Sequence, residues 1–154
     1  MELDDFGECE TFILIAVHST LEDYRLAYIL NKKFNLKLKR ITEDLDVAEA
    51  NYSCFEWNDF NLMNTWTLFS NICKIEKKTN KITESLFSNK EHIVRIYNLI
   101  PEHKTTNYFL KISNQEGSID EQEIIDQLGS VPNIILAYKV ETENLKSKSN
   151  LIIN

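Results

Sequence analysis

Histidine and cysteine, which bind metals or act as nucleophiles, are few in this chain. Six residues belong to them: His18, His92, His103, Cys9, Cys54 and Cys73. No two histidines lie four residues apart and no Cys-x-x-Cys pair occurs, so the short ligand spacings of a zinc site are missing. We therefore expect neither a metal nor a cofactor.

The cysteines give little support for catalysis. Their odd number and wide spacing argue against a disulfide framework and favour a reducing cytoplasm. A nucleophile formed by Cys54 or Cys73 with a distant histidine is one interpretation. Both cysteines lie in strand-like segments, however, where a buried structural thiol is more common. The Gly-x-Ser-x-Gly sequence of serine hydrolases is missing as well, so we assign no catalytic residue.

Phosphate-binding loops need clustered glycines, and this chain has three isolated ones, Gly7, Gly117 and Gly129. One weak anion site could form at residues 18–20, where a predicted strand leads into the N-terminus of a helix. Ser19 acting as the cap of that helix explains the same residues more simply.

Basic residues concentrate between positions 32 and 40. They are Lys32, Lys33, Lys37, Lys39 and Arg40. On one strand face they could follow a phosphate backbone while Trp57 or Trp66 stacks on bases, which is the RNA-binding hypothesis. A solvated sheet edge protected by lysines explains them too. The net charge of the whole chain is −7, which disfavours nucleic acid as the partner.

An apolar patch on the first predicted helix is the best indication of a binding surface. Leu21, Tyr24 and Tyr28 form it, on a different side of the helix from the face expected to pack on the core. Tyrosine is enriched in protein interfaces. We therefore predict that this patch contacts a partner protein or a second copy of the chain.

Hydrophobic periodicity predicts the elements that would position these residues. Strands are expected at 12–17, 35–41, 52–59, 65–75, 92–99, 107–113 and 133–140. Two helices are expected to end at Phe34 and Gly129, opened by capping boxes that pair Ser19 with Glu22 and Ser118 with Glu121. Residues 43–50 are predicted to be an exposed acidic connection.

This order of elements predicts an α+β fold. We expect one mixed, mostly antiparallel sheet with two helices on one face, made of ferredoxin-like or ACT-like strand–helix–strand units with an inserted β-hairpin. The run 12–17 is apolar throughout, so both of its faces should be covered. The apolar run 151–153 is expected to dock on the domain.

Length and charge indicate one domain with an acidic tail. A chain of 154 residues fits a single domain, 1–154. Its first ten residues contain five acids and no base, which leaves −2 of the net −7 for the rest. We expect residues 1–10 to be a mobile tail. The longest apolar run, 12–17, is too short for a membrane helix of about 20 residues, so no membrane association is expected.

The stretch 100–108 resembles the signature of a known family. It begins Ile100-Pro101-Glu102, and residues 106–108 read Thr-Asn-Tyr. This is similar to the IPExxxVDY family, small proteins of the Bacteroidota, although an amide replaces the family's carboxylate at position 107. The similarity extends to residues 12–40, 55–57, 108–112 and 145–148. The family has no assigned activity, so the resemblance implies a bacterial cytoplasmic protein and no particular reaction.

The signature residues suggest a structural corner. Pro101 fits a turn between two strands, and Glu102 can accept hydrogen bonds from backbone donors there. We favour a corner formed by Ile100, Pro101, Glu102, Asn107 and Tyr108, because a turn former stands beside a sheet residue. The alternative is a pocket that Glu102 and Tyr108 line together.

Three functions follow, in this order. The first is a small non-enzymatic adaptor or regulatory module that binds another protein. The second is an RNA-binding protein that uses Lys37, Lys39 and Arg40, whose affinity would fall steeply with salt. The third is an enzyme, which would require His18, Glu102 and Tyr108 to come within hydrogen-bonding distance.

Overall fold

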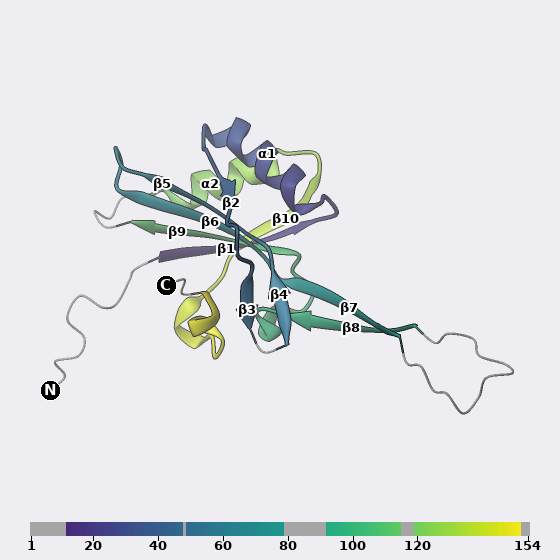
Figure 1. Ribbon diagram of the computed structural model, residues 1–154. Helices are drawn as coiled ribbons and strands as arrows, with labels where there is room; N and C mark the ends of the chain where they lie inside the picture. Colours follow the sequence, from purple (N-terminus) through teal and green to yellow (C-terminus); the bar gives the residue numbers. More distant parts are fainter. Residues whose placement is uncertain (1–11, 48, 79–91, 115–118, 152–154) are drawn as a thin grey trace, which may run out of the picture.

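The computed structural model describes residues 12–47, 49–78, 92–114 and 119–151 (Figure 1). The predicted acidic tail 1–10 lies outside these residues, as do Cys9 and Ser118. Among the described residues, no helix has the length and apolar character needed to span a membrane.

Six strands form the main sheet. In spatial order they are β10 (Ile134–Lys139), β1 (Phe12–Ser19), β9 (Tyr108–Asn114), β6 (Asn64–Ser70), β5 (Cys54–Asp59) and β2 (Lys39–Arg40). Every neighbouring pair is antiparallel, so the prediction of a mixed sheet was wrong. The reason lies in the helical connections, because each returns the chain to a strand that is not a neighbour. One leads from β1 to β2 at the far edge, and the other leads from β9 to β10 across β1.

Two further hairpins extend the structure. They are β3 (Leu45–Val47) with β4 (Ala50–Tyr52), and β7 (Ile72–Lys78) with β8 (His92–Asn98). Figure 1 shows β7 and β8 as an arm that projects from the sheet. The predicted exposed connection at 43–50 is therefore wrong in part. Leu45 and Val47 are partly buried and Ala50 is buried, and the acids between them concealed this short apolar alternation.

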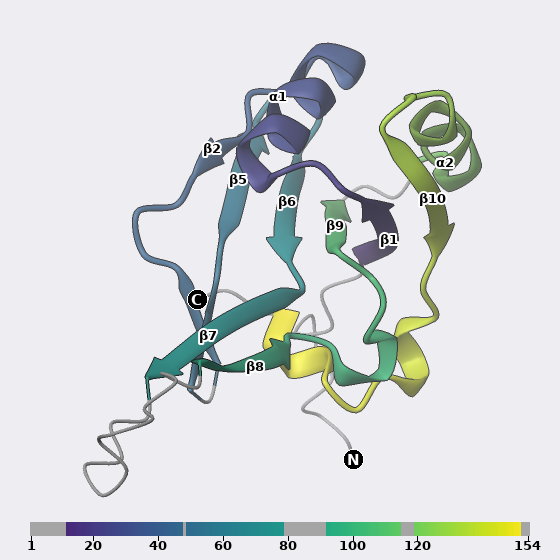
Figure 2. The same cartoon turned by 90° about the vertical axis from the view of Figure 1, so that its right-hand side faces the viewer.

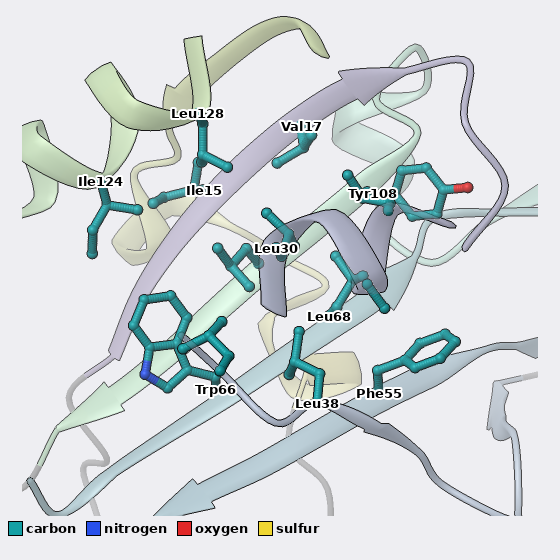
Figure 3. Close-up of a cluster of buried hydrophobic side chains, with 14 of the residues drawn as sticks. Ile15, Val17, Leu30, Leu38, Phe55, Trp66, Leu68, Tyr108, Ile124 and Leu128 are labelled. Atoms are coloured by element: carbon teal, nitrogen blue, oxygen red, sulfur yellow. The ribbon is translucent and has the colours of Figure 1, made fainter. Parts of the chain in front are cut away.

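Both helices lie on one face of the sheet, as predicted. They are α1 (Asp23–Phe34) and α2 (Glu121–Gly129). Leu30 of α1 and Leu128 of α2 pack with Ile15, Val17 and Trp66 of the strands in one buried cluster (Figure 3). Burial of side chains this large, at about 1.5–3 kcal/mol each, holds the helices on the sheet.

The other face of the sheet is also covered. Leu14 and Ala16 of β1 pack there with Phe109, Tyr52 and Leu151. Since Ile15 and Val17 face the helices, β1 is buried on both faces, as the apolar run predicted. The cover includes Tyr52 of β4, Leu99 and Ile100 after β8, and Leu151 of the 3-10 turn Lys148–Leu151. Leu151 is fully buried, so docking of the tail is confirmed for that residue, while 152–153 lie outside the described residues.

Neither helix begins with the predicted capping box. The Ser19 hydroxyl accepts the Leu21 N–H at 3.1 Å and donates to the Asn133 carbonyl at 2.8 Å, so it serves the turn after β1. Glu22 takes the N-cap position of α1 without a side-chain bond. The cap of α2 is Asp120, whose carboxylate accepts a hydrogen bond from the backbone of the third residue after it.

Three predicted strands differ in extent. The range 52–59 is divided at Ser53, between β4 and β5. Only Lys39–Arg40 of the range 35–41 pairs in the sheet. Leu36 and Leu38 are buried as alternation suggested, but the Asn31 side chain of α1 bonds both the N–H and the carbonyl of Leu38, where a strand partner would otherwise bond. The range 65–75 is two strands, β6 and β7, which separate at Asn71.

Candidate functional site

Asn71 is the centre of the corner that carries the signature. It is fully buried, and its Nδ2 donates to the carbonyls of His103 at 2.9 Å and Thr106 at 2.8 Å. Its Oδ1 accepts the Ile100 N–H at 2.7 Å. One amide thus satisfies three backbone groups of the segment 100–106, which makes its burial favourable. Sequence reasoning missed Asn71, although a lone asparagine inside an apolar run was an available signal.

Glu102 joins the signature turn to the C-terminal segment. Its carboxylate accepts the Lys146 N–H at 2.8 Å, the Ser147 N–H at 3.2 Å and the Ser147 hydroxyl at 2.6 Å. These bonds, led by the Ser147 hydroxyl, hold the pKa of Glu102 below its usual value. Pro101 begins the 3-10 turn that presents this carboxylate. The backbone donors lie more than 40 residues along the chain, which sequence spacing does not reveal.

The last signature residues join the corner to α1. Asn107 Oδ1 accepts the Ser19 N–H at 2.9 Å, and the Tyr108 hydroxyl donates to the Leu21 carbonyl. An aspartate at position 107 would also accept this bond, so the amide preserves the acceptor. Burial raises the pKa of Tyr108 to about 12, which keeps the phenol neutral.

A chain of polar side chains lies beside this corner. His18 Nε2 is 3.2 Å from the Thr106 hydroxyl, which is 3.4 Å from the Tyr138 hydroxyl, and His103 Nδ1 is 3.2 Å from Tyr138. These contacts orient both imidazole rings. Thr106 is fully buried, so a substrate has no access to the hydroxyl beside His18. Sequence reasoning did not select Thr106 or Tyr138.

The three residues of the enzyme hypothesis have separate partners. His18 bonds to Thr106, Glu102 to the C-terminal segment, and Tyr108 to the backbone before α1. No hydrogen bond joins any two of His18, Glu102 and Tyr108 in the part of the chain that the structure describes. Their geometry therefore provides tertiary contacts rather than an acid–base pair.

The described cysteines are free thiols, and they belong to no metal-binding group of the described residues. Cys54 and Cys73 are free, and burial raises the pKa of the Cys54 thiol to about 12, so it stays protonated near neutral pH. Within the described ranges, no group of three or more His, Cys, Asp or Glu side chains could hold a metal ion.

The predicted RNA-binding residues are all exposed, but only Lys39 and Arg40 lie in a strand. That strand, β2, is one edge of the sheet. Arg40 is bound by carboxylates, with nitrogen–oxygen distances of 2.6 Å to Asp44 and 3.7 Å to Asp23. Lys37 precedes the strand, and Lys32 and Lys33 belong to α1. Trp66 is buried and packs on Phe34, so it offers no face to a base.

The predicted partner-binding patch is divided by the structure. Tyr24 and Tyr28 are 55% and 58% exposed on the outer side of α1. Leu21 is partly buried and packs against the helical core. The Lys32 ammonium lies 4.7 Å from the centre of the Tyr28 ring, a cation–π contact on the surface. Of the predicted patch, Tyr24 and Tyr28 are thus exposed to a partner, and Leu21 is not.

The β10 edge is a surface that sequence reasoning did not select. β10 pairs on one side with β1, and Figure 2 shows it at one outer edge of the sheet, beside α2, with β2 at the other edge. Ile135 is 72% and Leu136 50% exposed. The register with β1 shifts here, because Ser19 pairs with Ile134 and His18 with Leu136, which makes Ile135 an extra, bulged residue.

No protein-family model, curated protein or solved structure matches this chain. The fold is α+β, with a signature corner held by hydrogen bonds. Among the described strands, β10 pairs only with β1 and exposes Ile135 and Leu136.

Proposed function

We propose that this protein is a non-enzymatic protein-binding module whose partner adds an extended segment to the β10 edge. The observation that carries this proposal is the contrast between the two edges of the sheet. The β2 edge has two residues, Lys39 and Arg40, both charged and exposed. Short, charged edges of this kind resist pairing with other chains.

The β10 edge is longer and less charged than β2, although the bulge at Ile135 interrupts its first part. It has six residues, contains no proline, and carries one charge, on Lys139. That charge already forms an ion pair, since Lys139 Nζ lies 3.0 Å from Glu121 Oε2. The exposed side chains of Ile135 and Leu136 add apolar area that a partner would remove from water.

The backbone of β10 has hydrogen-bonding groups available to a partner. The N–H of Val140, just after β10, donates to the Leu14 carbonyl of β1 at 2.8 Å. Because the direction of these groups alternates along a strand, Ala137 and Lys139 direct theirs away from β1. Strand addition uses such groups for affinity and adjacent side chains for specificity.

The same proposal includes the resemblance noted above. We infer membership in the IPExxxVDY family and a bacterial cytoplasmic location. The support is that the signature residues Glu102, Asn107 and Tyr108 each make a tertiary contact, and that Cys54 and Cys73 are free thiols. The signature is then a structural corner that supports the domain, and binding takes place elsewhere.

We also propose that β9, α2 and β10 form a ferredoxin-like strand–helix–strand unit. In its favour, β9 and β10 lie on either side of β1 and both pair antiparallel to it, so they run in the same direction. β1, α1 and β2 depart from that arrangement, because three strands separate β1 from β2.

Capture from native cell lysate with matched edge variants tests the proposed function. Ala137→Pro removes an outward N–H while keeping the bonds to β1, and Ile135→Lys with Leu136→Lys places charge on the exposed side. A partner captured by the wild type should be lost with both variants, and it should survive RNase. The matched control is Tyr24→Ser with Tyr28→Ser, which alters the α1 surface alone.

Two results would contradict the proposal. Equal capture by the wild type and by edge variants that keep the wild-type circular dichroism spectrum would show that β10 is not the docking edge. Loss of capture with the tyrosine variant alone would transfer the binding surface to α1. Nucleic acid retained by the protein and removed by RNase would favour the RNA hypothesis and the residues around Lys39.

A further inference from the structure

We infer that the segment added to β10 runs antiparallel to it and carries lysine or arginine near its own N-terminal end. This inference rests on the proposed function and specifies the partner of the same edge. It follows from the charges at the two ends of β10 and from the pairing of the whole sheet.

Carboxylates surround the C-terminal end of β10. Lys139 bonds to Glu121 of α2, and Glu141 and Glu143 follow on the chain. The hydrogen bond to Glu121 raises the pKa of Lys139 above its usual value, and the charges of Glu121, Glu141 and Glu143 raise it further. Three acids thus act on one base, which leaves an excess of negative charge beside this end of the edge.

One of the two lysines that follow in sequence has its ammonium at another site. The Lys148 ammonium lies 5.6 Å from the centre of the Phe12 ring, at the start of β1. Among the described residues, Lys139 is the one base that the structure places beside Glu121, Glu141 and Glu143. A cationic side chain from a partner would therefore meet an excess of negative charge there, and charge complementarity of this kind favours specific association.

The N-terminal half of β10 requires a different partner surface. Ile135 and Leu136 are its exposed residues, and they are apolar. A segment that pairs with the whole edge should therefore be apolar at one end and basic at the other. Its direction follows from the sheet, where every neighbouring pair is antiparallel, and antiparallel pairing is slightly more stable per residue. In that direction, the partner's N-terminal end lies along Lys139.

A second copy of this chain fits the edge less well. Antiparallel pairing of two β10 strands would place the acidic end of each beside the Ile134 end of the other. There the chain leaves β1 at Ser19, opposite Ile134, and reaches Glu22 and Asp23 within four residues. Acids would then approach acids at both ends of the interface.

Three blocked synthetic peptides of eight residues test the inference with the full-length protein. The first reads Lys-Thr-Lys-Thr-Val-Thr-Val-Thr, the second has glutamate in place of both lysines, and the third is the first in reverse order. Backbone amide shifts measured by NMR at low salt should change along β10. The first peptide should bind about three- to tenfold more tightly than either of the others, since each exposed ion pair contributes about 0.2–1 kcal/mol.

Charge reversal provides the control. Glu141→Lys with Glu143→Lys should abolish or invert the preference for the lysine peptide. Glu43→Lys with Glu76→Lys changes the net charge equally, at exposed positions on other elements, and should leave the preference in place.

Each other outcome would overturn the inference. Equal affinities for the three peptides would remove the charge argument, and shifts confined to elements other than β10 would remove the site. Shifts along β10 that depend on protein concentration without peptide would make a second copy the occupant. Absence of peptide binding while lysate capture still depends on β10 would reject the partner chemistry alone. Absence of both would reject the proposed function as well.

Discussion

Replacing Asn71 by leucine should destabilise the fold by about 3–5 kcal/mol. The substitution keeps the size of the side chain but leaves the Ile100 N–H and the Thr106 carbonyl buried without a partner, at about 1–3 kcal/mol each. The His103 carbonyl loses one bond and keeps another, from the Thr106 N–H at 3.1 Å, so its contribution is smaller. The total is a large fraction of the stability of a typical domain, about 5–15 kcal/mol.

Urea unfolding followed by tryptophan fluorescence measures this loss. The matched control is Asn98→Leu, because the Asn98 amide makes longer contacts near the same corner, 3.2 Å to the Lys104 carbonyl and 3.5 Å to that of Asn71. Asn98→Leu should lower the free energy of unfolding by less than about 1 kcal/mol, which is within the range of a single hydrogen bond. A cost for Asn71→Leu as small as that of the control would refute the assignment of Asn71 as the centre of the corner.

A second substitution at Asn71 separates lost donors from altered packing. Asn71→Asp keeps the acceptor but removes both donors and places a carboxylate against two carbonyl oxygens. Burial beside these oxygens should raise the pKa of the introduced carboxyl in the folded state above its unfolded value of about 3.9. The folded state then binds the proton more tightly, so this variant should lose stability, relative to the wild type, as pH rises above about 4. A deficit that does not change with pH would contradict this account of the site.

Three further predictions concern titration and side-chain contacts. Because hydrogen bonds lower the pKa of Glu102 in the folded state, its carboxylate should stabilise the fold above the unfolded pKa of about 4.3, and this stabilisation should be lost as pH falls through the folded pKa. The difference in urea midpoint between wild type and Glu102→Gln should therefore shrink from pH 7 to pH 3. A difference that stays constant would contradict this. Cys54 should react with a thiol reagent only on unfolding, whereas the half-buried Cys73 should react in the native protein. Cys→Ser variants separate the reaction rates of the two thiols. Equal rates in the native protein would contradict the burial of Cys54. Tyr108→Phe should cost about 0.5–1.5 kcal/mol in urea unfolding, because it removes the bond to the Leu21 carbonyl, and an unchanged midpoint would remove that contact from the account.

The sequence predicted the elements whose pattern is local. The apolar run in β1 and the periodicity of α1 and α2 each have a signal within a few residues, and each element formed. The predicted placement of both helices on one face is also confirmed.

Features that depend on distant residues were beyond sequence reasoning. Asn71 divides a continuous β-prone run because its amide bonds to groups about 30 residues away, and the donors to Glu102 lie about 45 residues away. The Ser19–Glu22 capping box failed because the Ser19 hydroxyl accepts the Leu21 N–H and donates to the carbonyl of Asn133, more than 100 residues along the chain. A pattern of neighbouring residues does not predict hydrogen bonds to residues this far along the chain.

The β10 edge was overlooked for a related reason. Its pattern predicted a strand, and a strand formed, but a strand is an edge only by its place in the sheet order. The strand prediction said nothing of the burial of Ile135 and Leu136, and the structure leaves both exposed. The sequence analysis selected the basic residues around Lys39 instead, and two of them, Lys39 and Arg40, form the edge that resists pairing.

Amide hydrogen exchange on β10, with and without the captured partner, tests strand addition most directly. In the free protein, the outward N–H groups of Ala137 and Lys139 should exchange quickly, while those of Leu136 and Tyr138, which face β1, are protected. Partner binding should slow exchange at Ala137 and Lys139 and leave the other two unchanged. Fast exchange at Ala137 and Lys139 in the complex would contradict docking at β10.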